Sequence, residues 1–465
     1  MGKSAFGPRL PVTLAALLAA LMSLAAAGPL AQAETLQEAL AKAYQNNPTL
    51  LAARAKLRAV DEGVPEALSG WRPTISLNYA IGKTHSSSSG GSSSGSGAQN
   101  RTPRTAAVTL DQNLFQGGRT RSTTLRAEHD VLAERARLAI TEQQVMFDAG
   151  TAYVDVQRDG AVLRLNQNNE RVLRRQLEAT RDRFQVGEVT RTDVAQAESR
   201  LARTTADRIQ SEGDLAQSRA AYRDVIGDFP GTLAPAKSLG KLPSNRDNAI
   251  NQARSSSPEV IASRFDERSA AAGVKVVTSE LFPTVDLEGE ANRRNDTSST
   301  DSRSDTQSVT ARFSVPLYQA GGVSARIRAA KQTHSRRRKE LDAAIRSAIA
   351  TAITAWEGYQ TTVAQIKAFG SEVRAGSIAL EGVRQEAQVG SRTVLDVLDA
   401  EQELLTARVS LVRAQRDEVV ASFDVRRRIG TLQAAQLNLG VPTYDFTAYY
   451  KQVRYKWFGW GIGDN

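Results

Sequence analysis

The side chains that most often perform catalysis are few in this chain and lie far apart. Its three histidines are His85, His129 and His334, and their spacing matches no metal-binding motif. Cysteine is absent, which excludes disulfides, thiolate metal sites and a cysteine nucleophile. No G-x-S-x-G, H-E-x-x-H or P-loop pattern occurs. We therefore expect a protein that is not an enzyme and that needs no cofactor or resident metal.

The chain is basic, with a formal net charge of +10 over 465 residues. A basic surface can bind nucleic acid, but no zinc-finger or stacking-aromatic pattern accompanies the charge here. The run Arg336-Arg337-Arg338-Lys339 is interpreted as the solvated face of a helix. No nucleic-acid partner is expected.

The first 33 residues have the pattern of a secretory signal peptide. Lys3 and Arg9 precede a short apolar run, and Ala31-Gln32-Ala33 is an A-x-A cleavage site that places the mature start near Glu34. No later segment approaches the ~20 apolar residues of a transmembrane helix. The sequence therefore predicts export without a helical membrane anchor.

The rest of the chain contains an internal repeat. Pro48 corresponds to Pro258, which lies 258 − 48 = 210 residues later, and Gly187 corresponds to Gly390, which lies 390 − 187 = 203 residues later. The offset changes once, in an interval that holds the Ser- and Gly-rich tract 85–99. The predicted organisation is a signal peptide (1–33), a first repeat (34–228), a linker (229–243), a second repeat (244–432) and an aromatic, basic tail (433–465).

Each repeat contains two short segments in which apolar and polar residues alternate. In the first repeat these segments are 74–82 and 106–115, and Val108, Leu110 and Leu114 are expected to share the apolar face of the latter. The second repeat has the same pattern at 285–291 and 309–315. Strands of this length, with one apolar and one polar face, suit a tilted crossing of a bilayer.

Long helical segments follow the strands. Residues Arg119 to about Phe184 contain no proline, and apolar residues recur every seven positions from Leu125 to Tyr153. The same spacing links Leu398 to Val419. A seven-residue repeat is typical of coiled-coil packing, and about 65 residues would form a rod of roughly 100 Å.

The order of these elements limits what they can build. Helices precede and follow each pair of strands, so the helices lie on one side of the sheet and the loops 83–105 and 292–307 on the other. Four strands cannot close a barrel, for which about eight is the practical minimum. An open sheet in lipid would leave backbone groups unpaired, so we expect identical chains to complete one tube with a polar interior.

These features resemble the TolC-like outer-membrane efflux and secretion channels. The segment Val389-Gly390-Ser391-Arg392-Thr393-Val394-Leu395-Asp396-Val397-Leu398-Asp399-Ala400-Glu401 is close to the second-repeat hairpin of that family. Leu114-Phe115-Gln116-Gly117-Gly118 is similar to its strand-to-helix turns, and the resemblance covers residues 34–432. It implies a mainly α fold with β: a trimeric α/β-barrel channel in which each chain gives four transmembrane strands and long coiled-coil-like helices in two tandem repeats.

The resemblance also implies partners and a site. The partners are two further copies of the chain, outer-membrane lipid, a periplasmic adaptor (membrane fusion) protein, and an inner-membrane ABC or other pump. Asp396 and Asp399 match the aspartates that ring the periplasmic aperture, although they could instead cap a helix start. Arg392, Thr192 and Asp193 match the contacts that close the aperture. Ala387 stands where the family often has a tyrosine latch.

Several functions stay open at this point. The aromatic tail and the missing lipid-anchor cysteine favour type I protein secretion, and multidrug or metal efflux is the alternative within the same class. A structural periplasmic coiled coil or adhesin would explain the rods and the signal peptide but not the paired amphipathic strands. The cargo, the pump and the role of the tail are not determined by the sequence.

Overall fold

The computed structural model describes residues 2, 33–87 and 99–461. The predicted signal peptide therefore lies almost wholly outside the described residues. Contacts divide the chain into two compact units. We call residues 1–43, 149–237 and 369–416 the hairpin unit, and residues 44–148, 238–368 and 417–465 the sheet unit. Each unit takes segments from both halves of the sequence.

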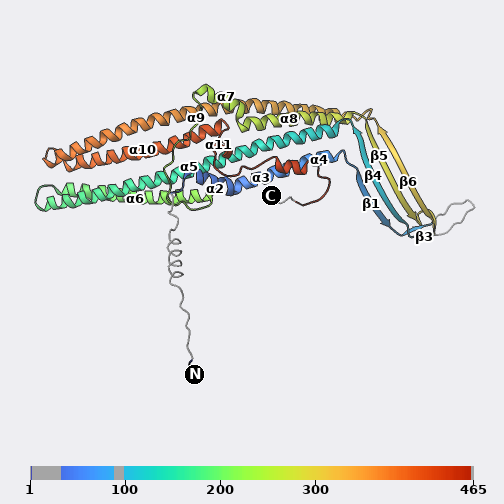
Figure 1. The fold of residues 1–465 in the computed structure, drawn as a ribbon, viewed down its shortest axis with the longest axis horizontal. Coiled ribbons are helices and arrows are strands. Elements are labelled where there is room, and N and C mark those ends of the chain that lie inside the picture. Colours follow the sequence, from blue (N-terminus) through green and yellow to red (C-terminus); the bar gives the residue numbers. More distant parts are fainter. Residues whose placement is uncertain (1, 3–32, 88–98, 462–465) are drawn as a thin grey trace, which may run out of the picture. The chain divides into compact units, whose positions relative to one another are not determined.

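Helices make up most of the described chain (Figure 1). They are α2 (Leu36–Asn46), α3 (Pro48–Asp61), α4 (Gly63–Ser69), α5 (Arg119–Gln185), α6 (Arg191–Ile226), α7 (Arg246–Ser256), α8 (Pro258–Thr278), the 3-10 turn η1 (Ser279–Leu281), α9 (Gly322–Gln388), α10 (Val394–Arg428), α11 (Ala434–Leu437) and α12 (Ala448–Val453). Among the described residues, no helix is both long enough and apolar enough to cross a bilayer.

The long helices agree with the sequence prediction. Helices α5 and α9 each contain 67 residues, and the predicted segment from Arg119 to about Phe184 is one residue short of α5. The predicted heptad row is only partly buried within the chain. Met146 and Tyr153 are fully buried, whereas Leu125 at the start of α5 is 38% exposed. The start of α5 therefore leaves this apolar side chain partly exposed in a single chain.

One four-stranded antiparallel sheet has the order β1-β4-β5-β6. Its strands are β1 (Thr74–Ile81), β4 (Arg104–Gln116), β5 (Thr284–Asn295) and β6 (Arg303–Ser314). Pairing of β4 with β5 joins the two halves of the sequence. A short hairpin, β2 (Thr84–Ser86) with β3 (Gln99–Arg101), occupies part of the predicted loop 83–105. Strands β5 and β6 extend into the predicted loop 292–307, which shortens that loop to residues 296–302.

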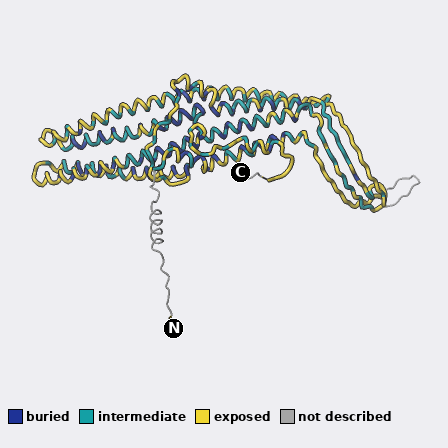
Figure 2. The backbone as a smooth tube through the Cα atoms, viewed as in Figure 1, coloured by how far each residue is buried: buried dark blue, intermediate teal, exposed yellow. Residues whose placement is uncertain are grey.

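Residues of like polarity line up across the strands. Ile75 pairs with Leu110, and Leu110 pairs with Gly289, whereas the adjacent row places Ser76 opposite Thr109. The hydroxyls of Ser76 and Thr109 are 2.6 Å apart. Figure 2 shows that the two edge strands are exposed. The predicted alternation of an apolar and a polar face is confirmed.

One residue of that prediction is wrong. The register of β4 against β5 shifts between Asn113 and Phe115, so that Leu114 is the extra residue of a bulge. Phe115 pairs with Val285 and takes the place in the apolar row that was expected for Leu114. One extra residue in a strand moves the side chains that follow it to the opposite face. A prediction that assumes strict alternation cannot detect such an extra residue.

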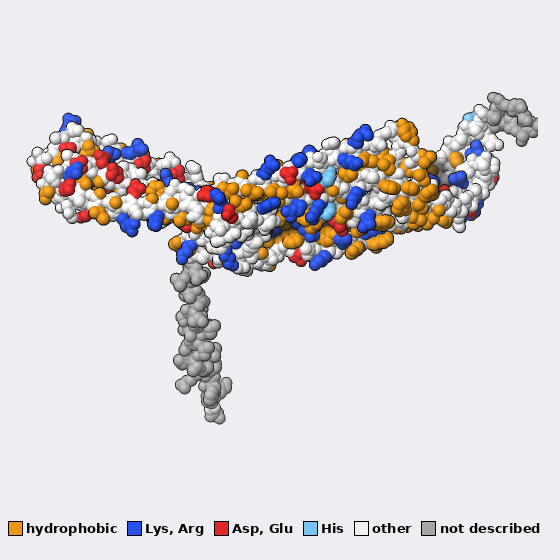
Figure 3. Space-filling view, turned by 90° about the horizontal axis from the view of Figure 1, so that it is seen from above, with side chains coloured by type: hydrophobic (Ala, Val, Ile, Leu, Met, Phe, Trp, Pro, Cys, Tyr) orange, Lys and Arg blue, Asp and Glu red, His pale blue; other side chains and the backbone are white. Residues whose placement is uncertain are grey.

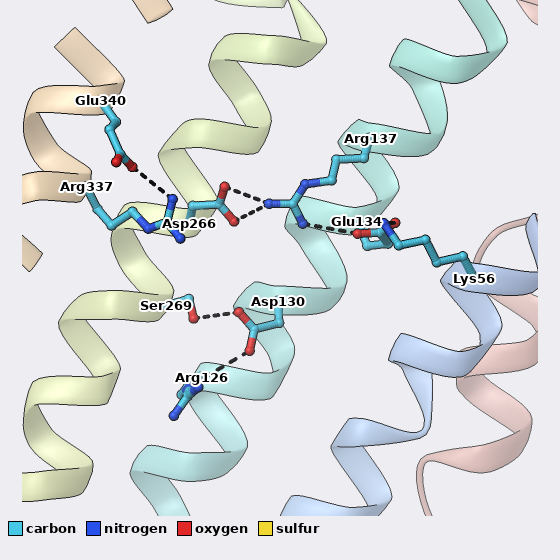
Figure 4. A network of polar contacts seen from close by, with 9 residues as sticks. All are labelled: Lys56, Arg126, Asp130, Glu134, Arg137, Asp266, Ser269, Arg337 and Glu340. Carbon is cyan, nitrogen blue, oxygen red and sulfur yellow. Dashed lines mark hydrogen bonds and ion pairs between the residues drawn. The ribbon is translucent and has the colours of Figure 1, made fainter. Parts of the chain in front are cut away.

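Polar contacts join the helices of the sheet unit (Figure 4). The guanidinium of Arg137 on α5 donates to both carboxylate oxygens of Asp266 on α8, at 2.6 and 2.7 Å. Lys56 on α3 lies 2.8 Å from Glu134 on α5. Both bonds to Asp266 come from one guanidinium nitrogen and are charge-assisted. Together with the pair of Lys56 and Glu134, they link α3, α5 and α8.

Two glycines at equivalent places in the repeat end long helices in different surroundings. Gly227 follows α6 with φ of 103°, and Gly430 follows α10 with φ of 79°, both in the left-handed region. A Cβ atom at Gly227 would meet nothing nearby, whereas one at Gly430 would collide with the carbonyl group of Ser256. Glycine at position 430 is therefore required by packing as well as by φ.

Candidate functional site at the helical hairpin tips

Two helical turns of the hairpin unit are built alike. The first joins α5 to α6 through residues 186–190, and the second joins α9 to α10 through residues 389–393. Gly187 and Gly390 adopt φ values of 83° and 80°, which glycine reaches without a Cβ penalty. The N–H groups of Glu188 and Ser391 then donate to carbonyls of the preceding helices at 2.9 and 3.0 Å. The sequence therefore turns sharply at both tips.

Each second helix starts with a reciprocal cap. In the first hairpin, the N–H of Asp193 donates to the hydroxyl of Thr190, and the N–H of Thr190 donates to the carboxylate of Asp193 at 2.8 Å. Thr393 and Asp396 repeat this arrangement in the second hairpin, with the Thr393 N–H 2.9 Å from Asp396. Such caps satisfy backbone donors that a helix start leaves unpaired.

Asp396 therefore caps α10 while remaining partly accessible. The hydrogen bond from the Thr393 backbone N–H, together with that from the Thr393 hydroxyl, lowers the pKa of Asp396. Its side chain is 39% exposed. A carboxylate with a lowered pKa is charged at neutral pH. Crowding of carboxylates from several copies around one opening would raise the pKa of some of them and so act against this local effect.

Asp399 makes a contact that sequence reasoning missed. Its carboxylate accepts a hydrogen bond from Arg200 of α6 at 2.6 Å, which links the two hairpins within one chain. The side chain of Asp399 is 49% exposed. In the repeat, Gln196 and Glu403 occupy the corresponding positions, so the pair is present once and the repeat offers no signal for it.

The predicted closing contacts do not meet within the described residues of a single chain. Arg392 donates to Glu386 at 3.0 Å, and its guanidinium lies 4.0 Å from Asp396. Asp193 is engaged in its own cap, and Thr192 is exposed. The contact of Arg392 with Thr192 and Asp193 therefore stays a prediction about neighbouring hairpins.

Sequence reasoning also missed an ion pair that occurs in both hairpins. Arg181 donates to Glu198 at 2.6 Å in the first hairpin, and Arg384 donates to Glu401 in the second. Both members shift by 203 residues, as the tip glycines do, so the repeat offset could have revealed this pair. Each bond ties the last turns of one helix to the first turns of the next.

Charged side chains gather around a cavity at the hairpin tips. A cavity of about 260 Å³ lies beside the second hairpin, and its lining includes Arg183, Arg384, Arg392 and Glu401. In the part of the chain that the structure describes, no three His, Asp or Glu side chains are grouped as a metal site. Exposed carboxylates at a helical tip can instead attract or repel ions that pass them.

Known proteins are similar to this chain in sequence and in fold. The family model described as outer membrane efflux protein matches residues 39–228 and 249–431. Outer membrane efflux protein BepC of Brucella suis is 35% identical over 93% of both chains. Proteases secretion protein PrtF of Dickeya chrysanthemi is 28% identical over 90% of this chain and 92% of its own. The Campylobacter jejuni CmeC outer membrane channel superposes with a TM-score of 0.78 at 15% identity, covering 90% of this chain and 89% of that one.

A structural coiled coil or adhesin would explain the long helices but not the paired amphipathic strands. The family match covers both the strands and the long helices, so it argues against those two alternatives. It also confirms the expectations of an outer-membrane location and of a protein without enzyme activity. The chain therefore belongs to the outer membrane efflux protein family, as a TolC-like channel protein of the outer membrane that extends into the periplasm.

Proposed function

We propose that the chain works as a homotrimer in which three four-stranded sheets close into one twelve-stranded barrel. One observation carries this proposal: β1 and β6 are exposed edges of a sheet that has one apolar and one polar face. Unpaired edges cost several kcal/mol per group in lipid, and pairing β1 of one chain with β6 of the next removes them. The polar faces then line a water-filled path.

Apolar surface next to the sheet supports the same assembly. Figure 3 shows hydrophobic side chains gathered on the helical segments that adjoin the sheet. Leu317 and Tyr318, just after β6, are 94% and 86% exposed. Exposed apolar surface of this kind marks an interface with protein or lipid, and in a single chain it stays uncovered.

The proposed trimer is the outer-membrane conduit of a tripartite export system. The system is completed by a periplasmic adaptor protein and an inner-membrane ABC or other pump. In the mature chain, after removal of the signal peptide, residues 34–228 and 244–432 form two copies of one structural repeat. Type I protein secretion is favoured by the likeness to PrtF and by the aromatic tail. Multidrug or metal efflux is the second candidate, favoured by the higher identity to BepC.

At the aperture, Asp396 and Asp399 from three chains would form two rings of carboxylates. Rings of this charge favour cations and repel anions. Arg392 would close the aperture against Thr192 and Asp193 of a neighbouring hairpin. Both aspartates are partly exposed, so their cap and ion pair leave room for a second role at the pore.

Single-channel conductance in planar bilayers tests this proposal. The wild type should form a small, cation-selective pore that multivalent cations block. The double variant Asp396→Ala with Asp399→Ala should lose both this selectivity and this block. Asp182→Ala is the control, because it removes an exposed carboxylate near the other tip. Unchanged selectivity in the double variant would place the selective ring elsewhere.

Deletion of the gene in its host separates the two kinds of cargo. Loss of particular proteins from the culture medium, with unchanged sensitivity to dyes and metals, would support type I secretion. Increased sensitivity with an unchanged set of secreted proteins would support efflux. Each phenotype should return to normal when the wild-type gene is restored.

A further inference from the structure

The C-terminal segment is packed onto the helices of the sheet unit. Tyr449 on α12 donates to Glu62 at 2.6 Å, and the guanidinium of Arg454 donates to Glu128 on α5 at 2.6 Å. Val453, between them in the sequence, is 2% exposed. These contacts hold α12 and Arg454 against the helices of the sheet unit.

Lys456 and Trp457 lie close to the start of the first strand. Arg72 donates to the carbonyl of Lys456 at 2.8 Å, and its guanidinium lies 4.9 Å from the centre of the Trp457 ring. A cation over an aromatic face is attracted to it. Arg72 is only two residues before Thr74, where β1 begins. The segment 455–460 is therefore held at the helical end of the sheet.

This segment exposes an unusual amount of aromatic surface. The exposed fractions are 71% for Tyr455, 66% for Trp457, 89% for Phe458 and 100% for Trp460. Trp71, next to Arg72, is itself 50% exposed. Large aromatic side chains are seldom left in water together unless a partner covers them.

We infer that residues 455–460 insert their aromatic side chains into the phospholipid interface of the inner leaflet of the outer membrane. This inference rests on the proposed function, because it requires the sheet to cross the bilayer. The apolar face of β1 begins with Ile75 and Leu77, which are 69% and 75% exposed. Arg72 contacts Lys456 and Trp457 and lies two residues before the first residue of β1. This part of the segment is therefore close to the point where a crossing strand would leave the membrane.

The chemistry of the segment fits lipid headgroups. Tryptophan and tyrosine favour the boundary between hydrocarbon and water, because their rings are apolar and their N–H and O–H groups are polar. Lys451 precedes the segment and Lys456 lies within it, and basic side chains close to a bilayer are attracted to anionic headgroups. The segment thus forms a second attachment beside the strands, in a chain that has no cysteine for a lipid anchor.

Fluorescence quenching by brominated phospholipids tests this inference on the full mature channel in vesicles. Trp71 and Trp356 are replaced by phenylalanine, which leaves Trp457 and Trp460 as the emitting residues. We expect loss of emission with phospholipids that carry bromine near the headgroup, and a smaller loss with bromine at the chain end. Equal quenching at both depths, or none, would overturn an interfacial position.

Two matched variants separate the inference from the proposed function. One retains only Trp356, which lies about 50 Å along α9 from its start and sets the baseline for a residue outside the membrane. The other carries Tyr79→Trp in β1 without the four native tryptophans. Quenching at position 79 with only baseline quenching at Trp457 and Trp460 would overturn the inference alone. Baseline quenching at position 79 would overturn the lipid-crossing sheet itself.

Discussion

Replacing Asp61 by asparagine should stabilise the sheet unit at neutral pH. Asp61 ends α3 and is 1% exposed, and neither carboxylate oxygen has a hydrogen-bond partner among the described residues. Burial raises the pKa of Asp61 from 3.8 to about 6, against the opposing effect of nearby Arg135. Asparagine has nearly the same shape and carries no charge, so the variant removes the free-energy cost of a charged carboxylate at this buried position.

The size of the effect follows from the pKa. One pKa unit corresponds to about 1.4 kcal/mol, so a rise of about two units corresponds to roughly 3 kcal/mol per chain. Because the pKa of Asp61 is higher in the folded state, that state holds the proton more tightly. The free energy of unfolding should therefore fall as pH rises from about 4 to about 6, and the whole penalty should be present above pH 6.

The assay is thermal unfolding followed by helical circular dichroism in detergent at pH 4 and pH 7.5. We expect Asp61→Asn to raise the melting temperature at pH 7.5 and to leave it nearly unchanged at pH 4, where the wild-type carboxyl is protonated. Glu66→Gln is the control, because it removes an exposed carboxylate of the adjacent helix α4. The control should change little at either pH.

Two results would refute this reasoning. Destabilisation by Asp61→Asn at pH 7.5 would mean that the carboxylate gains more from Arg135 than it loses by burial. Equal stabilisation at both values would mean that asparagine packs better for reasons unrelated to charge. A shift at pH 7.5 that is absent at pH 4 is the only pattern that burial of the charge predicts.

Three further substitutions test the hairpins and their support. Arg200→Ser removes the bond between the two hairpins of one chain and should raise single-channel conductance by loosening the tip; equal conductance would make that bond irrelevant to closure. Arg392→Ser should also raise conductance if this residue holds neighbouring hairpins together, and unchanged conductance would remove it from the aperture. Gly430→Ala should lower the melting temperature more than Gly227→Ala. Both variants force alanine into a left-handed conformation, but only position 430 is also blocked by backbone, and equal losses would contradict a packing role.

Local structure was largely predictable from the sequence. The alternation around Leu110 predicts a strand with two unlike faces, and the absence of proline after Arg119 predicts a very long helix; both are present in the structure. The tip glycines were located because the repeat offset aligns them. These features depend on neighbours within a few residues, and therefore the linear pattern records them.

Patterns in the amino-acid sequence were enough to predict the strands, the long helices, the turns and the family resemblance, and with them the proposal of a shared channel. Four features emerged only from the folded structure: β4 pairs with β5, Asp399 meets Arg200, Lys456 lies next to Arg72 just before β1, and the buried Asp61 has no hydrogen-bond partner among the described residues. Each of these depends on segments distant in sequence that packing brings together. Periodicity records which face of an element is apolar, but it holds no information on which distant element covers that face.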